Sequence, residues 1–280
     1  MGRLLLLSIV ASTLLTLGWL RLEGSPQAAA TQGGPYGPVV VELFTSQGCS
    51  SCPPADRLLS RLPDDPRLAG KVIPLAFHVD YWNQIGWTDP FSARRWSERQ
   101  EGYARAFRSS QVYTPQVVIG GRSECVGSRE DQVRRGIADA LAAEPAARVS
   151  LALAPPSPDG KLRATVAARL ARAAAGAGPG GLELWVALTE SGLTTAVGAG
   201  ENASRTLRND HVVRRLEKAF TLPAAAGAER SAELALELPS GAARDPKRLA
   251  NLSVAAFLQD PASLAIHGAA VARVAPGGAR

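Results

Sequence analysis

The sequence is short of cysteine, methionine and aromatic residues, and these shortages exclude some classes of protein. Its 280 residues include three cysteines, one methionine and 5% aromatic residues. Three cysteines, an odd and small number, do not fit a secreted scaffold built on many disulfides. Aromatic residues are not interleaved with basic clusters and no nucleic-acid-binding motif is present, so we expect no nucleic-acid partner.

The charge balance is only moderately basic. Lysine and arginine total 31 against 25 acidic residues, which gives a formal net charge of +6. Much of the basic excess is arginine scattered among alanines, a pattern that indicates a solvated surface. Apolar residues make up 46% of the chain, which can fill the core of one large domain or two ordinary ones.

The first 30 residues resemble a targeting segment. Residues 4–20 form an uncharged apolar run closed by Arg21, slightly shorter than the ~20 residues of a membrane span. Ala28-Ala29-Ala30 offers a small-x-small cleavage site. We therefore predict a signal peptide at 1–30, or alternatively an uncleaved anchor, followed by a flexible leader at 31–38. The body would be periplasmic or secreted, with membrane contact only through this segment if it anchors the chain to the inner membrane.

Residues 39–62 carry the most informative pattern. A β-branched run leads to a turn, then to Cys49-Ser50-Ser51-Cys52, and then to Pro53-Pro54 at the start of a helical pattern. Proline suits the first helical positions because its missing N–H would be unpaired there. A cysteine at a helix N-terminus is favoured as thiolate. We predict Cys49 as an exposed catalytic nucleophile and Cys52 as a more buried resolving thiol, with a structural disulfide or a metal site as alternatives.

A second apolar run, residues 71–82, is expected to be a buried strand that ends in polar and aromatic groups. In a parallel sheet, residues that follow the carboxyl ends of the strands line the site, so these groups could lie near Cys49. His78, Asp80 and Trp82 are our candidates for proton transfer or support of the site. Hydrogen bonds that merely fix the loop are the alternative for His78 and Asp80.

Thr114-Pro115 precedes a further β run, which turns at Gly120-Gly121 and returns through Cys125. A helix is expected at 129–142. Together, the order of strand, CxxC helix, strand, helix, Thr-Pro, hairpin and helix resembles a thioredoxin-like fold. More narrowly, ELFTSQGCSSCPPAD, HVDYWNQIGWTDPFS, YTPQVVIGGR and GAGENASRTLRNDHVVRRL resemble DUF1223, a bacterial secreted family.

The resemblance carries expectations for individual residues. It implies that Pro115 is cis and that Thr114 lies beside Cys49, where the backbone before the proline would hold a substrate chain. It implies fold and compartment without a settled activity. Cys125 departs from the family pattern, so we expect either a free, partly buried thiol or a partner for the CxxC pair.

After Pro145 the pattern changes to period-2 alternation, which is typical of antiparallel strands. Residues 198–208 lack the terminal Gly-Lys-Ser/Thr of a phosphate-binding loop, so we interpret them as a connection that packs on the first domain, or as a docking segment. Strands are expected at 149–153, 162–168, 182–188, 232–238, 249–258 and 263–274, and a helix at 210–220. The predicted fold class is an α/β thioredoxin-like domain (39–145) followed by a mainly antiparallel, sandwich-like β domain (146–280) with one inserted helix.

The leading functional hypothesis is an extracytoplasmic thiol–disulfide redox protein that acts on a protein or a small thiol or disulfide partner without a cofactor. One alternative is a Cu(I)-handling module with Cys49, Cys52 and His78 as ligands. CxxC alone is a weak metal signal, and methionine is absent apart from Met1. The other alternative is a thioredoxin-like binding protein without turnover.

Overall fold

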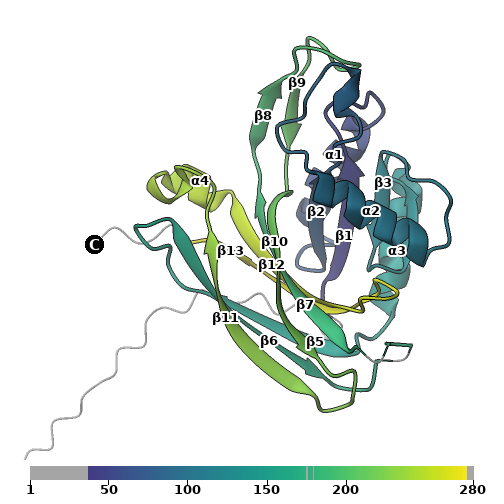
Figure 1. Cartoon of the computed structure of the whole chain (residues 1–280), viewed down its shortest axis with the longest axis vertical. Coiled ribbons are helices and arrows are strands. Elements are labelled where there is room, and N and C mark those ends of the chain that lie inside the picture. Colours follow the sequence, from purple (N-terminus) through teal and green to yellow (C-terminus); the bar gives the residue numbers. More distant parts are fainter. Residues whose placement is uncertain (1–36, 175, 179, 276–280) are drawn as a thin grey trace, which may run out of the picture.

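The computed structural model describes residues 37–174, 176–178 and 180–275 (Figure 1). The predicted signal segment at 1–30, and the leader up to residue 36, lie outside the described residues. Within the described part, none of the helices combines the length and the apolar character needed to cross a membrane.

A mixed eight-stranded sheet runs through the molecule. Its order is β13-β12-β7-β10-β2-β1-β3-β4, so strands from the second half of the chain continue the sheet of the first. The strands are β1 (Val39–Thr45), β2 (Val72–His78), β3 (Gln116–Ile119), β4 (Ser123–Val126), β7 (Leu182–Glu190), β10 (Val212–Leu222), β12 (Leu252–Gln259) and β13 (Ile266–Arg273).

Two smaller sheets complete the β structure. A three-stranded sheet of order β11-β6-β5 packs on the second-half part of the large sheet through one apolar core. A two-stranded hairpin stands beside α1 in Figure 1. These strands are β5 (Ala147–Leu153), β6 (Lys161–Leu170), β11 (Glu229–Glu237), β8 (Leu193–Ala196) and β9 (Thr206–Asn209). The predicted β-rich second half is therefore confirmed.

Helices cover both faces of the sheet in the first half. Because both faces of β1 are covered, alternate residues enter different cores: Val40 and Phe44 face α2, whereas Val41 and Leu43 face α1 and α3. The helices are α1 (Pro53–Arg61), α2 (Arg94–Ala106), α3 (Glu130–Ala142) and α4 (Pro246–Ala250), with short 3-10 turns η1 (Leu62–Asp64), η2 (Asn83–Ile85) and η3 (Ala242–Arg244).

The two halves of the chain share this sheet and one of its cores. β10 runs parallel to β2, with Val212 opposite Ala76, and the amide of Ala76 donates to the carbonyl of His211 at 2.9 Å. Phe77 and Trp96 of the first half pack in one cluster with Phe257 of the second. The large sheet therefore continues without a break across residue 145.

The predicted helix at 210–220 is wrong. Val212–Leu222 form the strand β10 instead, which pairs with β7 along its length. Register shifts fall between Val213 and Arg215 and between Lys218 and Phe220. A bulge inserts an extra residue and breaks the alternation of a strand. The apolar spacing from Val213 through Leu216 to Phe220 therefore imitates helical periodicity.

A short helix occurs instead where the sequence predicted the start of a strand. Asp245 caps α4 by accepting from the amides of Lys247 and Arg248, and Pro246 opens its first turn. The strand β12 then begins at Leu252 rather than Leu249.

Candidate active site

The CxxC motif lies between the end of β1 and the start of α1. Cys49 and Cys52 form a disulfide, with their Cα atoms 5.5 Å apart. Cys52 occupies the N-cap position, and its carbonyl accepts from the amides of Ala55 and Asp56. The predicted arrangement of strand, turn, CxxC and helix is therefore present.

The expected exposure of Cys49 is wrong. Both cysteines are 0% exposed. A segment from the second half of the chain, residues 197–205 between β8 and β9, lies against the CxxC turn, and we call it the covering loop. Buried Asn202 donates from Nδ2 to the carbonyls of Gln47 and Cys49, each at 2.9 Å, and Glu201 accepts from the amide of Ser50 at 2.9 Å. The covering loop is thus hydrogen-bonded to the backbone of the CxxC turn.

Gln47 ties this turn to two other elements. Its side-chain Nε2 donates to Asn209 at 2.9 Å and to Thr195 at 3.0 Å, both on the β8–β9 hairpin. Its Oε1 accepts from the indole of Trp87 at 3.2 Å. Its backbone amide donates to Asp89 at 2.8 Å. Gln47 is itself buried, so it acts as the polar center of this junction.

His78 lies beneath the turn and forms a buried ion pair with Asp89. His78 Nδ1 donates to Asp89 Oδ2 at 2.7 Å, and neither side chain is exposed. Burial opposes the charge of both groups, but their attraction outweighs it: the pKa of His78 is raised, and the pKa of Asp89 is lowered with further help from the amides of Gln47 and Phe91. Among the described residues, the buried Nε2 of His78 has no hydrogen-bond partner.

Asp56, one turn after Cys52 in α1, adds a second acid to this region. Burial raises the pKa of Asp56 to about 6, although the charge of His78 opposes the shift. A carboxyl with such a pKa is close to the point where it can both give and take a proton near neutral pH.

The Thr114-Pro115 peptide bond is cis, as the resemblance implied. Trp82 connects it to the CxxC turn: its Nε1 donates to Thr114 Oγ1 at 2.8 Å, and a Cβ placed on Gly48 would lie 3.3 Å from Trp82 Cβ. Trp82 therefore supports the site from the side of the proline loop.

The hydrogen bonds of Asp80 go to α2. Its amide donates to Ser97 Oγ, and Ser97 returns a hydrogen bond to the carboxylate. Asp80 therefore fixes its loop to α2, which matches the structural alternative for this residue.

Cys125 is a free thiol on β4, opposite Val117 of β3. Burial raises the pKa of Cys125 to about 11, and the carboxylates of Glu124 and Asp131 add to the shift. Since Cys49 and Cys52 bond to each other, Cys125 is not the partner of either.

The sequence predictions missed Gln47, Asp56, Asp89, Glu201 and Asn202. All five lie in stretches that carried the family resemblance, but nothing in their local pattern indicates a contact with the CxxC turn. Asp56 has one further sequence signal, its place one helical turn after Cys52. The described residues contain no cluster of three or more His, Cys, Asp or Glu side chains placed to hold a metal ion.

The fold and the site define an α/β protein with a buried CxxC disulfide under a covering loop. The chain belongs to the family described as "Protein of unknown function (DUF1223)", whose profile matches residues 40–259.

Two solved structures are similar over most of the chain. One is the crystal structure of protein AGR_C_4864 from Agrobacterium tumefaciens, which shares 30% sequence identity with this chain and has a TM-score of 0.58. The match covers 86% of this chain and 96% of that one. HBP35 of Porphyromonas gingivalis has a TM-score of 0.60 at 16% identity, over 89% of this chain and 79% of that one, a likeness of fold alone. No curated protein matches the sequence.

Proposed function

We propose that this chain is an extracytoplasmic thiol–disulfide redox protein that exchanges two electrons with a protein or a small thiol or disulfide. The observation that carries the proposal is the position of the Cys49–Cys52 disulfide at the start of α1, tied through Trp82 to a cis Thr114-Pro115 bond. The positive end of the helix would favour the thiolate of Cys49 once the disulfide is reduced.

The arrangement of residues 39–145 supports a thioredoxin-like unit. β1 lies between β2, to which it is parallel, and β3, to which it is antiparallel. α1 and α3 pack on one face and α2 on the other. In such a unit the backbone before Pro115 would hold the partner next to Cys49.

The exchange would proceed in two balanced steps. The thiolate of Cys49 attacks a disulfide of the partner, forms a mixed disulfide and expels one partner thiolate. The thiolate of Cys52 then attacks the sulfur of Cys49, which expels the second partner thiolate and leaves the Cys49–Cys52 disulfide. Two electrons thus pass to the partner, and the reverse sequence oxidises a dithiol.

Asp56 and His78 are the groups best suited to handle the proton of Cys52. Asp56 has a pKa of about 6 and lies one turn along α1, and His78 interacts electrostatically with it. In this role, Asp56 accepts the proton as Cys52 becomes a thiolate. The positive charge of His78, which is paired with Asp89, stabilises the carboxylate form of Asp56.

The compartment is part of the proposal. The N-terminal apolar segment with its small-residue site resembles an export signal, and a persistent disulfide suits an oxidising compartment. The chain would be periplasmic or secreted, or would touch the inner membrane only through that segment.

The first test is the reduction potential of the Cys49–Cys52 pair in the mature chain, measured by glutathione titration with thiol trapping in a Cys125→Ser background. A potential near about −120 mV would identify a disulfide donor, and one near about −270 mV a reductant. A pair below about −300 mV that does not respond to glutathione is a structural bridge, and the redox proposal would then be wrong.

One observation favours a second candidate, a binding protein without turnover. Both cysteines are fully buried under the covering loop, so a partner reaches them only after that loop moves. The double variant Cys49→Ser/Cys52→Ser separates the candidates, because a redox protein loses all disulfide exchange whereas a binding protein keeps its partner.

A further inference from the structure

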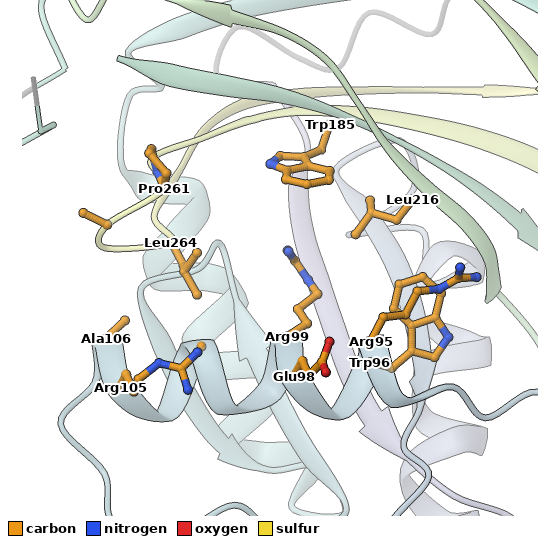
Figure 2. Close-up of a pocket in the computed structure, with 12 residues that line it drawn as sticks. Arg95, Trp96, Glu98, Arg99, Arg105, Ala106, Trp185, Leu216, Pro261 and Leu264 are labelled. Atoms are coloured by element: carbon orange, nitrogen blue, oxygen red, sulfur yellow. The ribbon is translucent and has the colours of Figure 1, made fainter. Parts of the chain in front are cut away.

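A separate pocket of about 560 Å³ lies between α2 and the second-half part of the large sheet (Figure 2). Its volume falls in the range of roughly 300–1,000 Å³ that is typical of small-molecule sites. None of the residues that line it belongs to the CxxC site. The lining residues on which the argument rests are Arg95, Gly102, Arg105, Trp185, Leu216 and Leu264, and we call this cavity the α2 pocket.

One side of the α2 pocket is apolar. Trp185 comes from β7, Leu216 from β10, and Leu264 from the turn between β12 and β13. In Figure 2 these three side chains lie opposite α2. Each is only partly buried. A half-covered indole between two leucines leaves apolar surface that a ligand would remove from water.

One of the cations that line the pocket, Arg99, is already paired with a carboxylate. Arg99 binds Glu42 through two hydrogen bonds of 2.8 and 2.9 Å, and its side chain is 9% exposed. It also donates to Gln259. The charge of Arg99 therefore belongs to the fold and is not available to a ligand.

Arg95 and Arg105, the other cations that line the pocket, have weaker partners than Arg99 has. The guanidinium of Arg95 stacks 4.3 Å from the ring of Trp96 and reaches the carbonyl of Arg214, but within the described residues it has no carboxylate partner. Arg105, whose side chain is 73% exposed, has within the described part of the chain one ion-pair partner, the exposed Glu101 at 3.9 Å. Glu98, which also lines the pocket, is bound by Arg94 outside it. The lining thus carries a positive charge that is not compensated.

Gly102 makes room for Arg105 at the apolar end of the cavity. A Cβ on Gly102 would lie 3.3 Å from Leu264 Cδ1 and 3.8 Å from Arg105 Nη2. The guanidinium of Arg105 therefore extends over the bare backbone of Gly102 to the neighbourhood of Leu264. Apolar surface and an available cation meet at this point.

We propose that the α2 pocket binds a small amphipathic anion, whose apolar body packs on Trp185 and Leu264 and whose acidic group binds Arg105. A guanidinium binds a carboxylate, sulfonate or phosphate through paired, charge-assisted hydrogen bonds. Arg95 is the weaker candidate for the acidic group because Trp96 already covers one face of its guanidinium.

Two fluorescent probes test the proposal on the full chain: 1-anilinonaphthalene-8-sulfonate and its uncharged counterpart N-phenyl-1-naphthylamine. They share the aromatic body and differ in the sulfonate. We expect saturable binding of the sulfonate at one site per chain. Arg105→Gln should weaken it about tenfold, the loss expected for a charge-assisted hydrogen bond, and should change binding of the uncharged probe by less than about twofold. The control Arg135→Gln, in an exposed ion pair on α3 away from the pocket, should change neither.

Gly102→Leu is the blocking variant. Leucine is favoured over glycine inside a helix, so α2 should keep its fold while the new side chain occupies the end of the cavity beside Leu264, and both probes should bind more weakly. Unsaturable binding, equal binding of both probes to wild type, or equal effects of Arg105→Gln and Arg135→Gln would each overturn the proposal. Retained binding in Gly102→Leu would show that the probes bind elsewhere and would overturn it too.

Discussion

The two halves of the chain meet at two junctions of opposite character. At the first, beside α2, Phe77 and Trp96 pack against Val213 and Phe257 in a buried apolar cluster. At the second, the CxxC turn meets the β8–β9 hairpin almost entirely through hydrogen bonds, chiefly those of Gln47 and Asn202. Apolar burial holds elements together without direction, whereas a polar junction contributes little net stability but is sensitive to each bond.

This difference indicates which junction opens first. Local opening favours regions with few buried apolar contacts, and the covering loop is held by such polar contacts. We therefore expect the halves to stay joined beside α2 while the covering loop exposes the disulfide. The comparison can be tested at each junction separately.

The largest effect is expected for Glu42→Gln at the junction beside α2, where one buried ion pair lies next to the apolar cluster. The buried Glu42–Arg99 pair connects β1 with α2, and Gln259 of β12 binds the same guanidinium. Removing the carboxylate charge leaves Arg99 buried and unpaired, which should lower the free energy of unfolding by about 3–5 kcal/mol. Urea denaturation measures this loss. Glu101→Gln, an exposed change on the same helix, is the control and should stay within about 0.5 kcal/mol.

Asn202→Ala should have a smaller effect on stability and a larger one on access to the disulfide. It removes both hydrogen bonds to the carbonyls of Gln47 and Cys49, at a cost of about 1–3 kcal/mol. Since the covering loop would then open more often, reduction of the disulfide by dithiothreitol should be about tenfold faster. Thr194→Ala, exposed on β8, serves as control. An unchanged reduction rate would mean that the covering loop is not what limits access.

The ionisable groups beneath the CxxC turn predict a pH dependence of stability. The pKa of Asp56 rises from 3.8 to about 6 on folding, so the folded state holds its proton more tightly and stability falls as pH rises between these values. The pKa of His78 is raised above 6.5, so its contribution is complete below pH 6.5 and is lost as pH rises through the folded pKa. Asp89, whose pKa is lowered, contributes above pH 3.8, and its contribution is lost as pH falls through its folded pKa.

The part of the stability that depends on Asp56 and His78 should therefore decrease from about pH 4 toward neutrality and beyond, whereas burial lowers the pKa of His211 to about 4 and its contribution changes in the opposite direction. Asp56→Asn should remove about 1–2 kcal/mol of this decrease, a value reduced from the full pKa shift because Asp56 is partly exposed. Urea denaturation across this pH range measures the slope. The same slope in wild type and Asp56→Asn would contradict the role assigned to this carboxyl.

Short-range features of the site could be predicted from the sequence, whereas its long-range features could not. Proline after CxxC and the apolar pattern behind it predict α1 because helix starts follow local rules. The contacts of Gln47 with Thr195 and Asn209 join residues that are 148 and 162 positions apart, and no local pattern encodes such a distance. The predicted exposure of Cys49 is wrong for the same reason, because Asn202, which bonds to the carbonyl of Cys49, comes from the other half of the chain.

The strand β10 shows a second limit of sequence reasoning. Its two bulges turn a period-2 pattern into one that resembles a helix, and only pairing with β7 decides the outcome. A helix at 210–220 cannot pair with β2, so the predicted helix also hides the way in which β10 joins the two halves. The junction beside α2 was therefore hidden even though its apolar residues were individually recognisable.

The smallest effect is expected at Cys125, which lies on β4, away from both junctions. Burial and two neighbouring carboxylates raise the pKa of Cys125 to about 11 from an ordinary 9.0, so at pH 8 its thiolate is about a hundredfold scarcer than that of an ordinary cysteine. The higher intrinsic nucleophilicity of a more basic thiolate recovers part of this loss. Alkylation of Cys125 by iodoacetamide should therefore be about tenfold slower than that of a model thiol, and Cys125→Ser should leave the potential of the Cys49–Cys52 pair unchanged. A shifted potential in this variant would show that Cys125 exchanges with the pair. A thiol could then reach the disulfide without passing the covering loop.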